Sequence, residues 1–337
     1  MTQRKARPGK LKLTLACWDY DRTRALADGS VAPEGIELVY LPLFVEETFF
    51  RMVRHREFDC AEMSLSSYVV SLGLKDRPFV AIPVFPSRCF RHSFIFVSAK
   101  SGIARPEQLA GRRVGNPEYQ LTAPVWIRGI LADEHGVAPD SPEYFLGGEE
   151  EPGRTEKLSL DLPARFRVRR IGARQTLAQM LAEGEIDALY SPRTPSTMHT
   201  RPKAVRRLFE DYVEVERAYF RRTKIFPIMH TVVIRREVYE RNRWCAQALM
   251  KAFAAAQRKV YADFAETAAL KVMLPWVTAH VEEARRELGE DWWAYGFAPN
   301  RHVLETFLRY HHEQGLSKRR YAPEELFVPE SFETFKI

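Results

Sequence analysis

The chain has 337 residues, 45% of them hydrophobic, which is enough for two domains and also compatible with one large one. Its formal net charge of +7 includes four basic residues within the first ten positions, so the folded body carries only about +3, which argues against a general nucleic-acid surface. No stretch approaches the roughly 20 apolar residues of a membrane helix, and the basic start lacks the apolar segment of a secretory signal.

These bounds predict a soluble, cytoplasmic protein with neither a nucleic-acid nor a membrane partner. Residues 1–10 are expected to form a flexible basic tail. The four cysteines show no CxxC or zinc-like spacing and are expected to be reduced. The sequence therefore contains no ligand motif that would indicate a metal site.

Two successive β/α series follow along the chain. In the first, the alternating segments 12–18 and 35–41 are typical of strands, 45–56 of a helix and 57–63 of a short strand. The second repeats this order, and its elements are predicted at 111–116 (strand), 120–135 (helix), 165–171 (strand), 174–184 (helix) and 185–191 (strand). The pattern predicts two α/β lobes.

An internal match supports the repeat. Met, Glu, an apolar residue and Asp recur at identical spacing in Met52, Glu57, Phe58 and Asp59 and in Met180, Glu185, Ile186 and Asp187. A polar loop follows each copy, at 64–68 and at 191–196. Ligands of open parallel sheets bind beyond the carboxyl ends of the strands, so both loops are candidate site segments. The two aspartates are expected to be turn or capping residues.

Segments 91–97 and 229–235 each place His and Ser or Thr before an apolar run, and both are interpreted as crossings between the lobes. This predicts that His92 and His230 enter one cleft from adjacent strands, with Arg88 and Arg91 beside them as a polar wall. Lobe 1 would then comprise 11–97 and 230–337, and lobe 2 would comprise 98–229. The helical region after residue 236 is expected to pack largely on lobe 1.

Several segments together resemble the 4,5-dihydroxyphthalate decarboxylase family within the type II periplasmic-binding-protein-like superfamily. They are CWDYDRTRAL, FDCAEMSLSSYV, FPSRCFRHSFIFV, LAGRRVGNPEYQLTAPVWIRGIL, EIDALYSPRTP and FPIMHTVVIRREV, and they extend from residue 11 to about residue 238. The resemblance implies a two-lobed α/β fold with two hinge crossings and a helical C-terminal region. It also implies a carboxy-lyase of aromatic catabolism, as in phthalate degradation.

The implied reaction converts 4,5-dihydroxyphthalate into 3,4-dihydroxybenzoate and CO2 by protonation of a ring carbon in the cleft between the lobes. The ring supplies its own electron sink, so no organic cofactor is required, and assistance by a divalent metal is left open. Histidine titrates nearest to neutral pH, which makes His92 and His230 candidates for proton transfer in either role. Asp19 is a candidate to orient a histidine or to accept a phenolic hydrogen bond.

The small aromatic dicarboxylate would be bound by residues of two kinds. Arginine matches a carboxylate with its planar fork, and helix starts can bind an oxyanion or an aromatic ring. The candidates are Arg22, Arg88, Arg91 and Arg193 together with Ser64, Ser66, Tyr119, Gln120 and Thr122.

Each candidate also has a purely structural interpretation. The arginines can be solvated loop charges, a single histidine can be structural, and the serines can cap helices. The cluster His311, His312 and Glu313 is expected to be a solvated helix face, since adjacent histidines point in different directions.

Two further functions stay open at this point: a non-catalytic small-acid binding protein or sensor of the same fold, and a pyrimidine-precursor enzyme of the superfamily. The absence of a cysteine-rich iron-binding run disfavours the second of these. A homo-oligomer is compatible with the sequence, but no segment specifies an interface.

Overall fold

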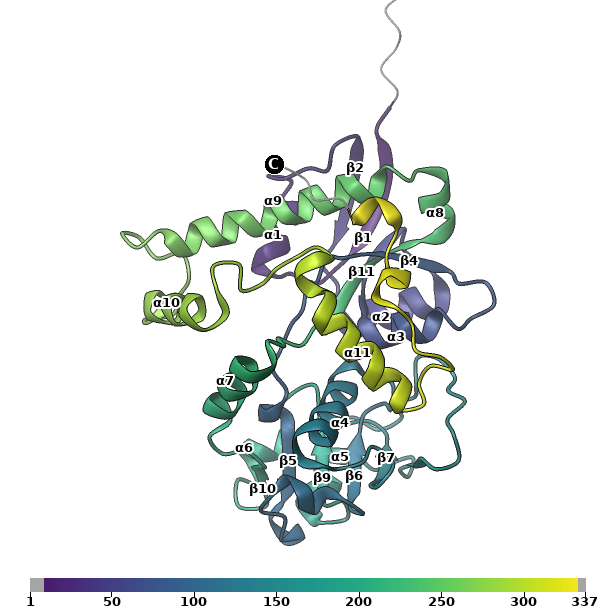
Figure 1. The fold of residues 1–337 in the computed structure, drawn as a ribbon, viewed down its shortest axis with the longest axis vertical. Helices are drawn as coiled ribbons and strands as arrows, with labels where there is room; N and C mark the ends of the chain where they lie inside the picture. The colour runs from purple at the N-terminus through teal and green to yellow at the C-terminus, as the bar shows by residue number, and fades with distance from the viewer. Residues whose placement is uncertain (1–8, 333–337) are drawn as a thin grey trace, which may run out of the picture.

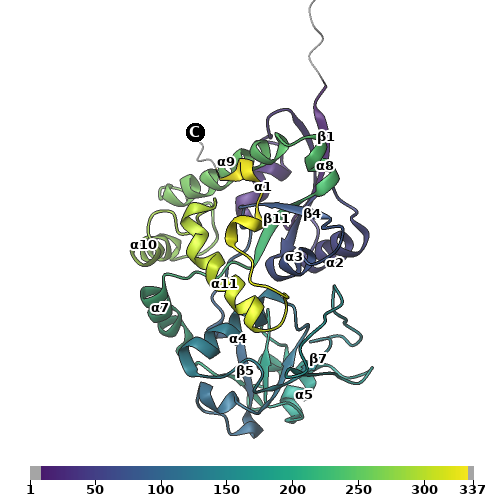
Figure 2. The same ribbon diagram turned by 45° about the vertical axis from the view of Figure 1, so that its right-hand side comes forward.

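The computed structural model describes residues 9–332. Two α/β lobes are joined by connecting segments, and long C-terminal helices lie alongside them (Figures 1 and 2). The two-lobed α/β architecture expected from the sequence is therefore confirmed. The predicted tail, residues 1–10, lies outside the described residues apart from its last two.

The first sheet has five strands in the order β2-β1-β3-β11-β4. β1, β2 and β3 are parallel, whereas β11 arrives from far along the chain and lies antiparallel between β3 and β4. Leu13 and Leu15 alternate along β1 into the core formed with helices α1 and α9. The strand bounds are β1 (Leu11–Ala16), β2 (Ile36–Leu41), β3 (Cys60–Ser64), β4 (Phe79–Ile82) and β11 (His230–Arg235), and the first helices are α1 (Asp21–Ala27), α2 (Val45–His55) and α3 (Leu65–Ser71).

The second sheet has six strands in the order β10-β5-β9-β6-β7-β8. Its parallel part consists of β9, β6, β7 and β8, and β5 joins β9 in antiparallel pairing. The strand bounds are β5 (Ile95–Ser98), β6 (Arg113–Asn116), β7 (Glu143–Leu146), β8 (Arg167–Arg170), β9 (Ala188–Tyr190) and β10 (Val205–Arg207), and the helices are α4 (Thr122–His135), α5 (Leu177–Glu183), α6 (Thr197–Thr200) and α7 (Tyr212–Thr223).

The repeated aspartates have the same structural role in both lobes. Asp59 precedes β3 and accepts hydrogen bonds from the backbone N–H and the hydroxyl of Thr14 on β1, both at 2.9 Å. Asp187 precedes β9 and accepts from the backbone N–H of Arg113 on β6 at 2.9 Å. Each carboxylate thus fastens its own strand to the neighbouring parallel strand.

The chain passes between the lobes in two segments, 83–91 and 224–229. They lie side by side, because Arg88 and Ile228 form an antiparallel bridge and the N–H of Cys89 donates to the carbonyl of Pro227 at 3.1 Å. The segments proposed from the sequence as crossings, 91–97 and 229–235, instead lead into strands β5 and β11. The crossings lie just before them, because the apolar runs that end those segments are long enough to pair within a sheet.

The C-terminal region contacts both lobes rather than lobe 1 alone. Its helices are α8 (Arg236–Arg241), α9 (Cys245–Ala265), α10 (Val277–Leu288) and α11 (Arg301–Glu313). Helix α9 packs on α1 of lobe 1, whereas α11 packs on α4 of lobe 2. The expectation that this region packs largely on lobe 1 therefore holds for α9 and fails for α11.

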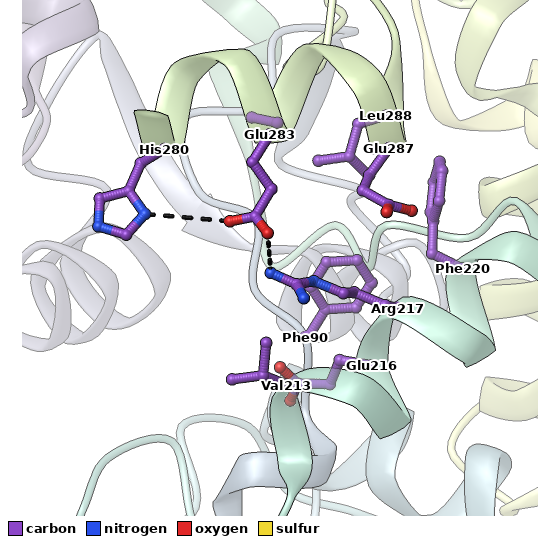
Figure 3. A pocket seen from close by; sticks show the side chains of 10 residues that line it. Phe90, Val213, Glu216, Arg217, Phe220, His280, Glu283, Glu287 and Leu288 are labelled. Atoms are coloured by element: carbon purple, nitrogen blue, oxygen red, sulfur yellow. Dashed lines mark hydrogen bonds and ion pairs between the residues drawn. The ribbon is translucent and has the colours of Figure 1, made fainter. Parts of the chain in front are cut away.

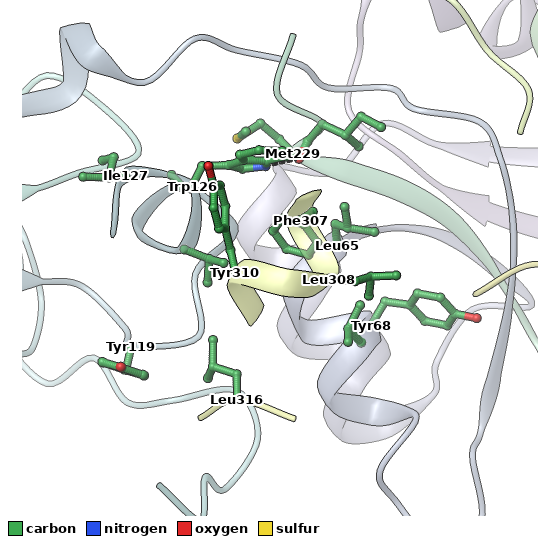
Figure 4. Close-up of a cluster of buried hydrophobic side chains, with 14 of the residues drawn as sticks. Leu65, Tyr68, Tyr119, Trp126, Ile127, Met229, Phe307, Leu308, Tyr310 and Leu316 are labelled. Atoms are coloured by element: carbon green, nitrogen blue, oxygen red, sulfur yellow. Dashed lines mark hydrogen bonds between the residues drawn. The ribbon is translucent and has the colours of Figure 1, made fainter. Parts of the chain in front are cut away.

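The contact between α11 and α4 explains this difference. Gly129 on α4 lies directly against the ring of Tyr310, and a Cβ atom there would overlap that ring. Trp126 on the same helix packs against Phe307 with ring centroids 5.4 Å apart. Figure 4 shows that the cluster of apolar side chains around these rings also includes Leu65 of α3 in lobe 1. One core therefore runs through both lobes.

His311 lies on the face of α11 that is buried in this core, and its side chain is fully enclosed. The expectation of a solvated face is therefore wrong for this residue. His312, next along the helix, is partly buried, and its Nδ1 lies 2.9 Å from the carbonyl oxygen of Ser317. The periodicity of the helix separates the two neighbours, and packing on α4 decides which of them is enclosed.

Candidate active site

The two lobes touch where helices α3 and α4 begin, at the carboxyl ends of parallel strands. The hydroxyl oxygens of Ser64 and Thr122 are 2.8 Å apart, and the backbone N–H of Ser66 donates to the same Thr122 oxygen at 3.0 Å. The hydroxyl of Ser66 is buried without a partner among the described residues. Three predicted site residues are thus brought together at the boundary between the lobes, in the position where open α/β sheets bind ligands.

Glu62 lies on β3 and is fully buried beside this boundary. Its carboxylate accepts hydrogen bonds from the Tyr20 hydroxyl at 2.7 Å and from the Trp18 backbone N–H at 3.2 Å, and it lies 2.6 Å from Nδ1 of His230. Burial alone would raise the pKa of Glu62, but the charge of His230 and these hydrogen bonds outweigh burial and lower it. Glu62 is therefore an ionised carboxylate inside the protein.

The ring of His230 is held from two sides. Nδ1 faces Glu62, and the ring of Phe49 on α2 packs against the imidazole edge to face, with centroids 4.8 Å apart. The side chain keeps 16% of its surface exposed. A carboxylate on Nδ1 selects the tautomer and leaves Nε2 for another partner. His230 is thus held in one orientation at the start of β11 by Glu62 and Phe49.

His92 does not share this environment, which corrects the expectation of two histidines in one cleft. Its buried ring packs against Phe209 and Tyr219, with centroids 5.5 and 5.0 Å away. Burial, with a smaller contribution from the charges of His135 and Arg222, lowers the pKa of His92 to about 4. Residues 92–94 form a 3₁₀ turn that directs the side chain toward α7 before β5 begins.

Asp19 is also separated from the histidines. Its side chain is half exposed and forms an ion pair with Arg24 at 3.4 Å. The carboxylate that orients His230 is Glu62, which the sequence analysis did not select. The signal that could have found it is the acidic residue in the middle of the otherwise apolar strand at 60–64, where an unpaired charge would be costly.

Arg91 is the arginine that best fits an anion site. It is buried at the end of the first crossing, and within residues 9–332 it forms no ion pair with a carboxylate. Nη1 donates to the carbonyl of Pro192 at 3.2 Å, and Nε lies 3.1 Å from the sulfur of Met229, the residue before His230. Burial lowers the pKa of Arg91. A buried guanidinium is costly unless something pairs with it, so this position favours an acidic ligand.

The other three arginines have partners within the protein. Arg88 donates to the carbonyls of Phe226 and Ala294 at 3.0 and 2.7 Å, which joins the second crossing to the C-terminal region. Arg22 lies between the rings of Tyr20 and Trp293, 4.0 and 4.3 Å from their centroids. Arg193 pairs with Glu46 on α2 at 2.5 Å, across the boundary between the lobes. The first two therefore have structural roles, whereas the third faces the opening.

Tyr119 and Gln120 are buried in lobe 2. The hydroxyl of Tyr119 donates to the carbonyl of Gln314 at 3.1 Å, and the guanidinium of Arg128 lies 4.0 Å from the ring centroid. The amide of Gln120 donates to Glu156 at 2.8 Å, and its oxygen has no partner among the described residues. Both residues shape the loop before α4, and neither has an exposed surface.

A cavity of about 570 Å³ lies between the lobes and is lined by residues of both. From lobe 1 it is lined by Glu46 and Phe50 on α2, which also carries Phe49 against His230. Residues 148–155 and Arg193 line it from lobe 2. Within this lining, Glu149 is buried and lies 2.8 and 2.7 Å from the hydroxyl of Ser191 through its two carboxyl oxygens. Glu149 was not selected from the sequence.

A second hollow lies between α7 and α10 (Figure 3). Its charged side chains pair with one another: Glu283 faces both Arg217 and His280, and Arg221 pairs with Glu287. Phe90 and Phe220 contribute apolar surface. With its charges already paired, this hollow fits a small acid less well than the cavity between the lobes does.

Within residues 9–332 no group of three His, Cys, Asp or Glu side chains is arranged to hold a metal ion. In the same part of the chain, no helix combines the length and the apolar character needed to cross a bilayer.

No family model matches the chain. The 4,5-dihydroxyphthalate decarboxylase of Comamonas testosteroni is 44% identical over 328 residues, which covers 97% of this chain and 99% of that protein. The protein of the same name from Pseudomonas putida is 43% identical over 202 residues, 60% of this chain and 78% of that protein. Among solved structures, the periplasmic sulfonate-binding protein SsuA of Methylobacillus flagellatus KT has a TM-score of 0.55 at 14% identity, covering 96% of this chain and 93% of that chain. This similarity confirms the periplasmic-binding-protein-like fold.

Glu62→Gln should lower the free energy of unfolding by about 1–3 kcal/mol near neutral pH, because the buried donors of Tyr20, Trp18 and His230 lose their charged acceptor. The pKa of Glu62 is lower in the folded than in the unfolded chain. Its contribution is therefore fully present above the unfolded-state pKa of about 4.3 and is lost as the pH falls through the folded-state pKa. Urea unfolding at several pH values should show the difference between wild type and variant shrinking in acid.

Glu34→Gln serves as the control, because Glu34 is exposed. It should change stability by less than about 0.5 kcal/mol at every pH. A difference for Glu62→Gln that stays constant down to acidic pH would show that the charge of Glu62 is not what stabilises this region.

Proposed function

The chain belongs to the 4,5-dihydroxyphthalate decarboxylase family, and on that premise we propose that it converts 4,5-dihydroxyphthalate into 3,4-dihydroxybenzoate and CO2 in the cleft between its lobes. The observation that carries the proposal is the pairing of His230 with the buried carboxylate of Glu62 at 2.6 Å. A pocket that only binds an acid requires donors and shape, whereas a histidine oriented by a buried carboxylate also provides proton transfer.

The substrate supplies the electronic part of the reaction. Each ring carbon that bears a carboxylate has a hydroxyl in the para position. Removal of that hydroxyl proton increases the electron density at the carbon, and protonation of the carbon gives a dienone. Loss of CO2 then restores the aromatic ring. The protein has to exchange protons at two places and hold the ring still, which it can do with its own side chains.

His230 is suited to the hydroxyl proton. The negative charge of the Glu62 carboxylate beside Nδ1 stabilises the imidazolium that forms when Nε2 accepts a proton, as it does in other carboxylate–histidine pairs. Tyr20 shares the Glu62 carboxylate and limits its movement, with its hydroxyl at 2.7 Å. His230 therefore acts as the base that activates the ring and later returns the proton.

Arg91 is suited to the carboxylate that stays on the ring. It is buried, forms no ion pair within residues 9–332 although the charge of Glu216 acts on it, and contacts Met229, the residue before His230. A firm hold on the departing carboxylate would oppose the reaction, because catalysis requires tighter binding of the transition state than of the ground state. The proposal also includes a cytoplasmic location, supported by four cysteines that are all free.

The first experiment incubates the purified, EDTA-treated protein with 4,5-dihydroxyphthalate and follows CO2 together with the aromatic product by chromatography. We expect stoichiometric CO2 and 3,4-dihydroxybenzoate. A protein whose melting temperature rises with the ligand, but which forms no product with or without added Mn²⁺, would be a binding protein and would contradict the proposal.

His230→Ala should lower kcat by about 10²–10⁴, the usual contribution of a general acid or base. Since Arg91 still holds the carboxylate, the affinity measured by calorimetry should change only a few-fold. His280→Ala is the matched control, because His280 is exposed and lies on α10. Normal turnover at saturating substrate in His230→Ala would exclude the proton-transfer role.

Arg91→Lys keeps the charge and removes the planar fork. We expect KM to rise about tenfold or more with a smaller change in kcat, because an ammonium group cannot bind a carboxylate through two parallel hydrogen bonds. Arg24→Lys, at an exposed arginine paired with Asp19, should leave both parameters unchanged. If KM and kcat are also unchanged in Arg91→Lys, Arg91 has a structural role.

A further inference from the structure

We propose that Glu149, on the lobe 2 side of the cleft, is the acid that protonates the ring carbon, acting opposite His230. This inference rests on the proposed decarboxylase function and goes beyond it, since it assigns the second proton-transfer group.

The backbone around Glu149 is held tightly. Gly147 and Gly148 follow β7, and a Cβ atom on Gly148 would overlap the backbone of Glu151, so only glycine permits this sharp turn. The carbonyls of Gly148 and Glu149 accept hydrogen bonds from Leu177 and Ala178, the first residues of α5, at 2.9 and 3.0 Å. Glu149 is therefore fixed at the carboxyl end of the second sheet.

The carboxyl group has few partners for a buried acid. Its two oxygens lie 2.8 and 2.7 Å from the Ser191 hydroxyl, and the same hydroxyl accepts from the backbone N–H of Arg193 at 3.0 Å. A hydroxyl has only one proton to donate, so a proton on Glu149 would satisfy the second short contact. Within residues 9–332 Glu149 forms no ion pair, although it is buried.

The electrostatic surroundings favour the protonated form. Burial raises the pKa of Glu149 to about 7, and the charge of Glu150 adds to the effect. The hydrogen bond from Ser191 and the charges of Arg193 and Arg154 oppose it without cancelling it. Near neutral pH a substantial fraction of Glu149 therefore carries a proton that it can donate.

Glu149 and His230 are linked through residues at the boundary between the lobes. Glu149 lines the cavity between the lobes together with Phe50, the neighbour of the Phe49 ring that packs on His230. Ser191, its partner, precedes Pro192, whose carbonyl accepts from Arg91, and Arg91 in turn contacts Met229 beside His230. Within the proposal, we place the ring between these two groups, with Arg91 holding its retained carboxylate.

The two groups have complementary surroundings. His230 faces an ionised carboxylate, which favours accepting a proton, whereas Glu149 is a buried carboxyl group that favours keeping one until the reaction. Nε2 of His230 takes the para hydroxyl proton, the O–H bond of Glu149 breaks, and a C–H bond forms at the ring carbon. The bond to the carboxylate then breaks, CO2 leaves, its electron pair restores the ring, and His230 returns its proton to the oxygen. Solvent reprotonates Glu149, so one proton is consumed for each CO2 released.

The test compares wild type, Glu149→Gln, Glu149→Asp and the control Glu210→Gln, whose parent side chain is exposed, lies outside the cavity lining and pairs with Arg206. Three quantities are measured: kcat over a range of pH, the affinity for 4,5-dihydroxyphthalate by calorimetry, and the rate at which 3,4-dihydroxybenzoate exchanges a ring hydrogen for deuterium in D₂O. Melting temperatures verify that each variant is folded.

We expect Glu149→Gln to lower kcat and ring exchange together by about 10²–10⁴ while the affinity changes only a few-fold. In wild type, kcat should fall as the pH rises above about 7, since ionised Glu149 has no proton to give; this alkaline limb should be absent in Glu149→Gln. Glu149→Asp should keep part of the activity and the limb, which a purely structural role would not predict. Glu210→Gln should match wild type.

If Glu149→Gln keeps the kcat, the ring exchange and the alkaline limb of the wild type, the inference is overturned and the decarboxylase function stays intact. Weaker affinity with normal kcat at saturation would overturn it as well, because Glu149 would then bind substrate without protonating it. If wild type itself releases no CO2, the proposed function fails and this inference fails with it.

Discussion

The ionised carboxylate of Glu62 inside lobe 1 is the interaction on which the arrangement of the site depends. A buried charge costs several kcal/mol unless its hydrogen bonds are satisfied, and here the donors come from the end of β1, the start of α1 and the start of β11. The register of β11 against β3 makes the contact between Glu62 and His230 a diagonal one. In this register His230 lies opposite Ser64, and Val232 lies opposite Glu62. A shift of β11 by one residue would turn His230 to the other face of the sheet and leave Glu62 without its histidine partner.

The boundary between the lobes has one apolar and one ionic side. On the apolar side, α11 packs into α4, and the indole N–H of Trp126 donates to the carbonyl of Ile228 in the second crossing at 2.9 Å. On the ionic side, Glu46 of α2 pairs with Arg154 and Arg193. The side chain of Arg193 is 44% exposed, so water reaches the ionic side, whereas the packed rings of the apolar side exclude it. The cavity that contains Glu149 is on this same side.

Much of the fold could be predicted from local pattern. Alternating apolar residues marked β1, the repeat of Met and Asp marked the two β/α series, and Asp59 and Asp187 have equivalent structural roles. The site was predicted only in part. Arg91 and His230 were among the candidates, but so were Arg88 and Arg22, which satisfy backbone carbonyls and aromatic rings. The charge of an arginine does not show whether it binds a ligand or holds the fold together. The partners of Arg88 are 138 and 206 positions away along the chain, so its neighbours in sequence do not reveal them.

The sequence by itself determined the elements, their two-lobed order and the residue types available for acid–base chemistry, because strand alternation, helix periodicity and glycine turns act over a few positions. Only the tertiary structure decided which of these residues form the site. It paired His230 with Glu62 across 168 positions, placed Glu149 against Ser191 across 42, and enclosed His92 among aromatic rings. Burial and hydrogen bonding between distant segments set protonation and exposure, and no short window of sequence contains both partners of such a contact.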